Sequence, residues 1–302
     1  MVIDKLVEKI KEKKNPCIVG IDPEWNKIPD CYKKADSPEP EVIFRWAKDI
    51  IDCAADIVAA IKPQIAFFEV YGAEGMKVFQ KIVAYAHEKG LVVIEDSKRN
   101  DIGNTAKAYA NAHLSREGVI NADFMTVSPF LGTDSIQPFL DVAEKNEKGV
   151  FVLVKTSNPS SVEISEAKNE NGEKISDWLA GYISSVGQNY LGKSGYSVVG
   201  AVVGATFPEE AKRLRKRMHN HYFLVPGFGA QGGSAKDIIS CFNDDGLGAV
   251  VSSSRGILYK YLEIENYDNS KNMYLYIVRK QMLEMQQEVY GELKKNCKRM
   301  AY

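Results

Sequence analysis

Short apolar runs alternate with amphipathic helical patterns along almost the whole of this 302-residue chain. The runs are rich in Val and Ile and mostly lack polar–apolar alternation, which is typical of parallel strands covered by helices on both faces. Eight such runs occur: Cys17–Ile21, Ala59–Lys62, Leu91–Glu95, Phe124–Ser128, Val150–Val154, Val198–Val203, Tyr222–Val225 and Ala249–Ser252. This repeat predicts an α/β fold, a (β/α)8 TIM barrel rather than a doubly wound sheet.

Helical patterns connect these runs and also begin and end the chain. Met1–Lys11 predicts an N-terminal helix, and Asn269–Arg299 predicts a long C-terminal helix. No linker rich in Pro, Gly or Ser divides the chain, so we expect residues 1–302 to form a single domain. Connecting helices are predicted at Glu41–Ala55, Ala73–Lys89, Ser135–Lys145, Asp177–Leu191 and Glu209–Met218. Two longer loops, Pro29–Pro40 and Asn158–Lys174, follow the first and fifth strands, at the end of the barrel where active sites form.

The composition excludes several functional classes. The formal net charge of −1 gives no global field that would attract nucleic acid or a membrane surface. The N-terminus lacks the apolar core of a secretory signal, and no stretch approaches the length of a membrane span. The five cysteines are scattered and form no CxxC pair, which argues against a zinc or redox motif and favours reduced thiols in the cytoplasm.

Charged residues gather where the second and third strands are predicted to end. Strand alternation places Asp96 and Lys98 on the same face, and Asp101 follows shortly after. Lys62 ends the neighbouring strand, so it would lie beside Asp96. An alternating set of two ammonium groups and two carboxylates predicts an ion network in which each charge is balanced by its neighbours. Such a network is either structural or catalytic.

Other polar residues follow the remaining strands. Each one alone would be interpreted as a solvated loop residue, but a barrel brings all of them to one rim, where as a set they predict an active site. They are Asp22 after the first strand, Ser128 at the fourth, Thr156 and Ser157 after the fifth, Gln231 after the seventh and Arg255 after the eighth.

Three motif matches need interpretation. Gly187–Ser194 fits the P-loop pattern but follows a helix and precedes a strand, which indicates a helix end and turn instead. Gly227–Gly232 fits GxGxxG after a strand, but no acid follows at the distance that a dinucleotide site requires. We interpret it as a phosphate-binding loop completed by Arg255. His219 and His221 lie beside the basic run Arg213–Arg217 and predict a solvated helix end rather than a metal site.

These segments carry a family resemblance. The chain resembles the orotidine 5′-monophosphate decarboxylases through the DxKxxD motif Asp96–Asp101, extended as far as Thr105. DxKxxD alone is shared by a wider superfamily of phosphate-binding barrels, whereas the extended string is more specific. The resemblance is also carried by Gly20–Pro23, Ile61–Pro63, Thr156–Pro159, Val225–Gly232 and Ser254–Ile257, in the order that the family requires.

The resemblance implies conversion of orotidine 5′-monophosphate to uridine 5′-monophosphate (UMP) and CO2, the last step of de novo UMP synthesis, with no cofactor and no metal. It implies that Lys98 protonates C6 of the pyrimidine and that Asp96 lies beside the departing carboxylate. Lys62 would link the charge network to the ribose. Direct decarboxylation leaves a carbanion with no electron sink. A fixed ammonium group in a site closed from water can stabilise the negative charge that develops at C6.

The resemblance also implies the binding residues. Asp22 would bind the ribose hydroxyls and Ser157 the pyrimidine amide edge. Gln231 and Arg255 would bind the phosphate under a lid formed by Pro226–Gly233. Ser254 stands where many relatives have Gly, and its side chain could crowd the phosphate or bond to it. In the family, the residues corresponding to Asp101, Ile102 and Thr105 enter the neighbouring subunit's site, which implies a homodimer with shared active sites.

Two alternatives stay open at this point. A metal-dependent sugar-phosphate decarboxylase or aldolase of the same superfamily would need a further carboxylate at the end of the second strand, where this chain has Lys62. A non-catalytic nucleotide-binding relative would not need the intact charge set. The sequence also leaves open fusion to, or association with, orotate phosphoribosyltransferase, and a free-standing enzyme is the default expectation.

Overall fold

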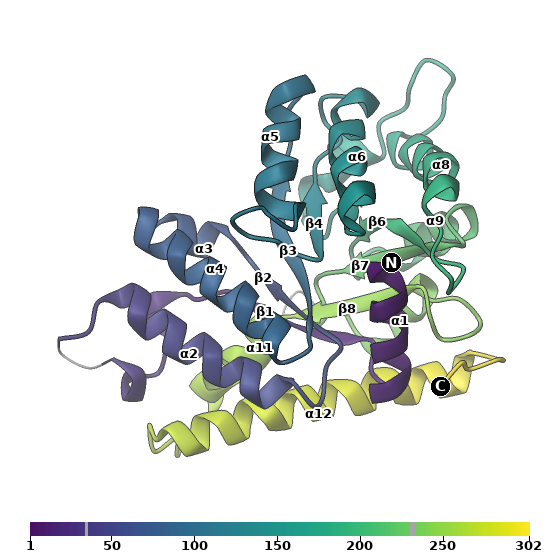
Figure 1. Cartoon of the computed structure of the whole chain (residues 1–302). Helices are drawn as coiled ribbons and strands as arrows, with labels where there is room; N and C mark the ends of the chain where they lie inside the picture. Colours follow the sequence, from purple (N-terminus) through teal and green to yellow (C-terminus); the bar gives the residue numbers. More distant parts are fainter. Residues whose placement is uncertain (34–35, 230–232) are drawn as a thin grey trace.

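The computed structural model describes residues 1–33, 36–229 and 233–302, in which eight parallel strands close into a barrel (Figure 1). Each strand pairs with the next along the chain, and β8 closes the barrel by pairing with β1, where Ile18 lies opposite Ser252. The predicted (β/α)8 fold is therefore confirmed. The strands are β1 (Cys17–Ile21), β2 (Ala60–Pro63), β3 (Val92–Arg99), β4 (Phe124–Val127), β5 (Gly149–Lys155), β6 (Ser197–Val203), β7 (His221–Val225) and β8 (Ala249–Ser253).

The strands are buried on both faces, as their continuous apolar runs predict. Apart from Leu153 and the last two residues of β3, every strand residue is buried. The inner faces fill the barrel with large side chains. The rings of Phe124 and Phe151, for example, meet with centroids 5.2 Å apart.

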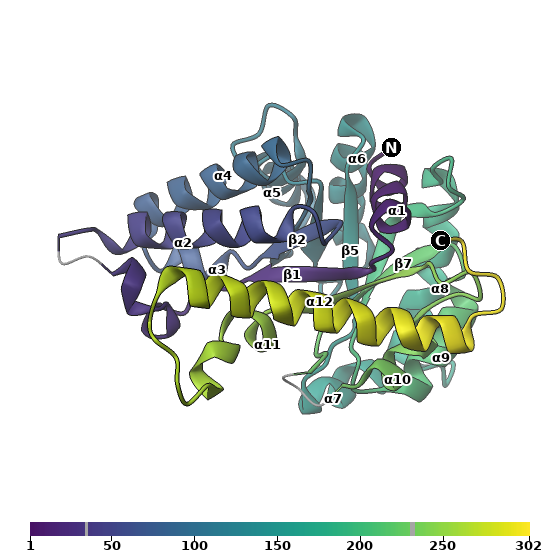
Figure 2. The same ribbon diagram turned by 90° about the horizontal axis from the view of Figure 1, so that it is seen from below.

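Helices surround the barrel close to their predicted positions. Figure 2 shows α12 running the length of the molecule beside α2 and β1, both of which it contacts. No helix in the described ranges is long and apolar enough to cross a membrane. The helices are α1 (Val2–Lys13), α2 (Glu39–Ala54), α3 (Ala66–Glu69), α4 (Gly72–Glu88), α5 (Gly103–Leu114), α6 (Gln137–Asn146), α7 (Val162–Ser165), α8 (Ile175–Gly187), α9 (Pro208–Arg217), α10 (Ala235–Ile238), α11 (Arg255–Leu258) and α12 (Lys271–Asn296).

The N-terminal helix α1 lies at the end of the barrel where the strands begin. Val2 N–H donates to the carbonyl of Glu147, just before β5, and Asp4 accepts from the N–H of Ser194, just before β6. These contacts place α1 opposite the rim that carries the predicted site residues, so α1 serves the barrel and not the site.

Two strand and loop predictions differ from the structure. β3 continues beyond its predicted end at Glu95 as far as Arg99, because a shift in its register with β4 accommodates the polar residues. The segment 158–174 is not simply a loop. It contains a 3₁₀ turn (Pro159–Ser161), helix α7 and a β-bridge between Lys168 and Lys174.

The motif interpretations have mixed outcomes. Gly187 ends α8 and precedes β6, so the P-loop match is a helix end, as predicted. A side chain on Gly187 would collide with the ring of His221, 2.2 Å from its Cβ position. The prediction of a solvated helix end was wrong for two residues. His221 begins β7 and is fully buried. Arg215 is also buried, and its guanidinium donates to the carbonyls of Cys241, Gly248 and His221.

Buried His221 predicts a pH-dependent stability. Burial lowers the pKa of His221 from 6.5 to about 4, while its Nδ1 bonds to the carbonyl of Val199 at 2.7 Å. Between these pH values the unfolded chain binds a proton that the folded chain does not, so the free energy of unfolding falls as the pH falls. The loss from this group reaches about 3 kcal/mol at pH 4. Urea denaturation of wild type and His221→Gln from pH 8 to 4 should show a shallower fall in the variant. Parallel curves would contradict this prediction.

Candidate active site

A cavity of about 430 Å³ opens at the rim formed by the C-terminal ends of the strands. This is the face on which TIM barrels carry their active sites. Its wall includes residues from or just after every strand of the barrel: Asp22, Lys62, Gln64, Phe67, Asp96, Lys98, Thr126, Leu153, Thr156, Ser157, Asn158, Val202, Leu224, Pro226, Gly227, Phe228, Ser252, Ser253, Ser254 and Arg255.

The carboxylate of Asp96 lies between two ammonium groups. Its Oδ2 accepts from Lys62 Nζ at 2.7 Å, and its Oδ1 accepts from Lys98 Nζ. Lys62 and Asp96 are buried, whereas the side chain of Lys98 is 44% exposed toward the cavity. Three of the four charges of the predicted network are thus joined within one chain.

The network keeps its buried members charged. Burial disfavours the carboxylate of Asp96, but Lys62 and Lys98 hold its pKa well below the ordinary value. Burial likewise disfavours the ammonium of Lys62, but the charges of Asp96 and Asp22 raise its pKa above the ordinary value. Each charge is therefore stabilised by its neighbours, and the cavity presents fixed charges that need no rearrangement.

The backbone at Lys98 has a left-handed conformation, with φ of +46°, which is uncommon for a residue other than Gly. Thr126 on β4 holds this conformation. Its hydroxyl accepts from the N–H groups of Ser97 at 3.0 Å and Lys98 at 2.9 Å, and donates to Asp96 Oδ1 at 3.2 Å. One hydroxyl therefore uses its full bonding capacity to shape the end of β3.

Asp22 follows β1 and faces Lys62 across the cavity wall. Its Oδ1 is buried and has no hydrogen-bond partner among the described residues, so it is an unsatisfied acceptor at the cavity wall. Tyr259, just after α11, fixes the backbone there: its hydroxyl donates to the carbonyl of Asp22 at 2.5 Å and accepts from Glu24 N–H at 2.8 Å.

The segment Thr156–Asn158 forms the wall after β5. Thr206, after β6, donates to the carbonyl of Ser157 at 3.2 Å. A side chain on Gly204 would lie 2.8 Å from Ser157 Cα, so only Gly lets the two loops approach this closely. The polar groups of this wall are thus fixed from the neighbouring strand.

Arg255 and Ser254 form the wall after β8. Arg255 is exposed at the start of α11. The hydroxyl of Ser254 occupies the space above Gly20 on β1, where a Cβ would lie only 1.8 Å from it. The absence of a side chain on Gly20 therefore leaves room for the side chain of Ser254. Gln231, predicted to bind phosphate, lies outside the described residues.

Comparison with known proteins decides the family. Residues 15–265 match the profile of the orotidine 5′-phosphate decarboxylase / HUMPS family. The chain is 44% identical over 269 residues to the orotidine 5′-phosphate decarboxylase of Clostridium perfringens, covering 89% of this chain and 92% of that one. The chain belongs to this family.

Solved structures of the family superpose well. OMP decarboxylase from Leishmania donovani has a TM-score of 0.75 and 28% identity, with 97% of this chain and 98% of that chain covered. UMP synthase from the same organism has a TM-score of 0.74 and 30% identity, covering 95% of this chain but 56% of that longer chain.

Three predicted site residues lie apart from the cavity. Among the described residues that line it, none is Asp101, Ile102 or Thr105. Asp101 Oδ1 instead accepts from the N–H of Ile102 at 2.8 Å, and the side chain of Ile102 is 55% exposed. Asp101 is half-buried and Ile102 and Thr105 are exposed, apart from the cavity of their own chain.

The sequence analysis missed two residues that shape the site. Thr126 was assigned to a strand without a role, and Tyr259 was not singled out. For Thr126 the available signal was a polar residue in the apolar run Phe124–Val127, next to the strand that carries the charges. No comparable signal marks Tyr259, which reaches Asp22 only through the tertiary fold.

Replacing Thr126 by Val should weaken both the site and the fold. Two buried N–H groups and Asp96 would lose their partner, which we expect to lower the free energy of unfolding by roughly 2–4 kcal/mol. Misplacement of Lys98 should lower kcat/KM by about 100-fold. Thr126→Ser, which keeps the hydroxyl, is the matched control and should stay near wild type. A Val variant with wild-type kcat/KM would show that this hydroxyl does not position the site.

Proposed function

We propose that this chain decarboxylates orotidine 5′-monophosphate to UMP and CO2 without a metal or an organic cofactor. The observation that carries the proposal is the array in which Asp96 lies between Lys62 and Lys98 at the cavity wall. Pure nucleotide binding does not need such an array. A decarboxylase does, because charge develops at one carbon in the transition state.

In the proposed reaction the bond between C6 and the carboxylate breaks. CO2 departs, the electron pair stays on C6, and C6 takes a proton from Lys98 Nζ. Asp96, kept ionised by its two ammonium neighbours, lies beside the substrate carboxylate and disfavours the charged ground state. Lys98 then regains a proton from solvent, so the enzyme returns to its starting state.

The remaining wall residues bind the parts of the substrate that do not react. We assign the ribose hydroxyls to Asp22 and Lys62, and the pyrimidine amide edge to Ser157. We assign the phosphate to Arg255 and Gln231, with Pro226 and Ser254 in the adjoining wall. Binding energy from the phosphate can drive closure of the site, so its contacts should affect turnover as well as affinity.

The charge pattern favours this reaction over the metal-dependent alternative. A sugar-phosphate enzyme of the superfamily would need a carboxylate where this chain has Lys62, whose ammonium repels a cation and is already paired with Asp96. In the described part of the chain, no group of three or more His, Cys, Asp or Glu side chains gathers as metal ligands.

Absorbance at the orotate band tests the proposal directly. Wild type mixed with orotidine 5′-monophosphate in EDTA should lose the orotate chromophore and release CO2. Lys98→Ala should lower turnover by at least about 1,000-fold, because it removes the proton donor. Its affinity for UMP should largely survive, since Lys98 is not assigned to binding. A wild type that binds UMP without turnover would support a binding protein instead, and comparable activity in Lys98→Ala would refute the assigned role.

We further propose a homodimer in which each subunit completes the other's site. The support is the exposed Ile102 after β3, together with exposed apolar residues after the neighbouring strand β4, where Ser128 N–H donates to the carbonyl of Arg99 at 2.9 Å. The side chain of Phe130 is 76% exposed and that of Leu131 is 50% exposed, in the loop after β4. Exposed apolar groups in such number mark a contact surface. Asp101 of one subunit would supply the fourth charge of the partner's network.

Mixing two inactive variants tests the shared site. Lys98→Ala and Asp101→Asn should each be inactive alone. In a mixed dimer, one of the two sites receives an intact Lys98 and an intact Asp101. Re-equilibrated equal mixtures should therefore regain about one quarter of the wild-type activity. Mixtures that stay inactive, although mass measurements show mixed dimers, would contradict the shared site.

Two further proposals concern the cellular setting. Orotate phosphoribosyltransferase makes the proposed substrate, and we propose that this chain associates with it. The support is that UMP synthase of Leishmania donovani contains a region similar to this chain within a longer chain, of which the match covers 56%. Co-purification tests it. We also propose a cytoplasmic location, supported by five cysteines that are all unpaired.

A further inference from the structure

A lysine at the end of β5 is buried behind the cavity wall. The side chain of Lys155 has no exposed surface, and Lys155 is not among the described residues that line the cavity. Its Nζ donates to Ser165 Oγ at 2.9 Å, lies 3.9 Å from Glu166 Oε1 and lies 4.0 Å from the ring centre of Phe207. A buried ammonium is costly unless such partners balance it.

These contacts join the two loops that form the wall beside Ser157. Ser165 and Glu166 belong to the segment after β5, whereas Phe207 belongs to the loop after β6. The same two loops meet at the site, where Thr206 donates to the carbonyl of Ser157. Lys155 therefore connects the segment after β5, which lines the cavity, to the loop after β6, which supports Ser157.

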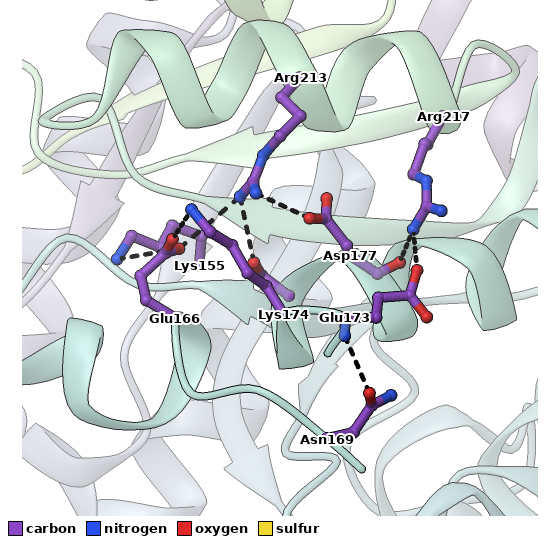
Figure 3. Close-up of polar contacts among 9 residues, drawn as sticks. Lys155, Glu166, Asn169, Glu173, Lys174, Asp177, Arg213 and Arg217 are labelled. Atoms are coloured by element: carbon purple, nitrogen blue, oxygen red, sulfur yellow. Dashed lines mark hydrogen bonds and ion pairs between the residues drawn. The ribbon is translucent and has the colours of Figure 1, made fainter. Parts of the chain in front are cut away.

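Glu166 is the centre of a wider ion network. Lys174 lies 2.5 Å from its Oε2, and Arg213 lies 3.7 Å from its Oε1. Figure 3 shows Arg213 reaching from α9 to both Glu166 and Asp177. Its Nη1 lies 2.7 Å from Asp177 Oδ2. Burial opposes the charge of Glu166, but Lys174, Arg213 and Lys155 keep its pKa below the ordinary value. The segment after β5 is thus tied to α8 and α9.

We propose that Lys155 and Glu166 are positioning residues for recognition of the pyrimidine base. By joining the loops after β5 and β6, they fix Thr156–Asn158 in the cavity wall without touching the substrate. The inference rests on the proposed function, which assigns the base to Ser157.

The position of the network makes the expected effect selective. Thr156, Ser157 and Asn158 follow β5, whereas Arg255 follows β8, three strands away around the closed barrel. Loosening the wall after β5 should therefore weaken binding of the base and leave phosphate binding unchanged. A general loss of stability would weaken both.

Glu166→Gln tests this selectivity, because it removes the carboxylate that faces Lys155. We expect KM for orotidine 5′-monophosphate and Kd for UMP to rise about tenfold or more, with a smaller change in kcat. The Kd for ribose 5-phosphate, which lacks a base, should not change. Equal losses for both ligands, or wild-type affinity for UMP, would overturn the inference.

Glu173→Gln is the matched control. Glu173 lies in the same segment and pairs with Arg217 (Figure 3), with 2.6 Å between Arg217 Nη1 and Glu173 Oε1. Among the described residues, Arg217 is its ion-pair partner and Lys155 is not. This variant should bind both ligands as wild type does. If it lost UMP affinity like Glu166→Gln, the effect would belong to the whole segment and not to the Lys155–Glu166 pair.

A second variant keeps the test valid if a lone buried charge unfolds the chain. Lys155→Met retains an apolar stem against Phe207, and the double variant with Glu166→Gln leaves no unpaired ammonium. If the pair acts as one unit, the double variant should lose no more UMP affinity than either single variant. If the fold-losses of UMP affinity in the two single variants multiplied in the double variant, the two residues would act independently and the inference would be overturned. A wild type that fails to decarboxylate its substrate would contradict the proposed function, whereas an active wild type with an insensitive Glu166→Gln contradicts only this inference.

Discussion

The placement of one carboxylate between two ammonium groups determines the rest of the site. Asp96 can stay ionised in a buried position because Lys62 reaches it from β2 and Lys98 from the end of β3. Both contacts require the strands to end at a common rim and in a fixed register. The left-handed backbone at Lys98 and the hydroxyl of Thr126 follow from the same requirement, since a regular strand would not hold the end of β3 in this shape.

The cavity walls after β8 and β1 are also fixed by contacts between segments far apart in the sequence. Ser254 on one side of the barrel closure fits over Gly20 on the other. Tyr259 bonds to the backbone of Asp22, so the wall that follows β8 and the wall that follows β1 are joined. When the walls of a site are joined in this way, binding energy from a remote part of a substrate can lower the barrier at its reacting atom.

The sequence predicted what depends on local pattern and missed what depends on tertiary contact. Apolar runs of parallel strands are readable, and so are charges at strand ends, so the barrel was predictable and Asp96 and Lys98 could be singled out. A polar residue in the apolar run of β4 marks Thr126, but the sequence does not name its three partners, which lie about 30 residues away along the chain. Arg215 was misjudged for the same reason: its charge predicts solvent exposure, but distant carbonyls bury it.

The exposure of Lys98 explains why a second subunit would matter to the chemistry. Its side chain is 44% exposed in one chain, and an ammonium in contact with water stabilises a developing carbanion weakly because water screens it. The array of Lys62, Asp96 and Lys98 is joined within one chain, and this exposure leaves its Lys98 ammonium open to water. A neighbouring chain that covered this side with Asp101 and Ile102 would both exclude water and place a second carboxylate near the Lys98 ammonium.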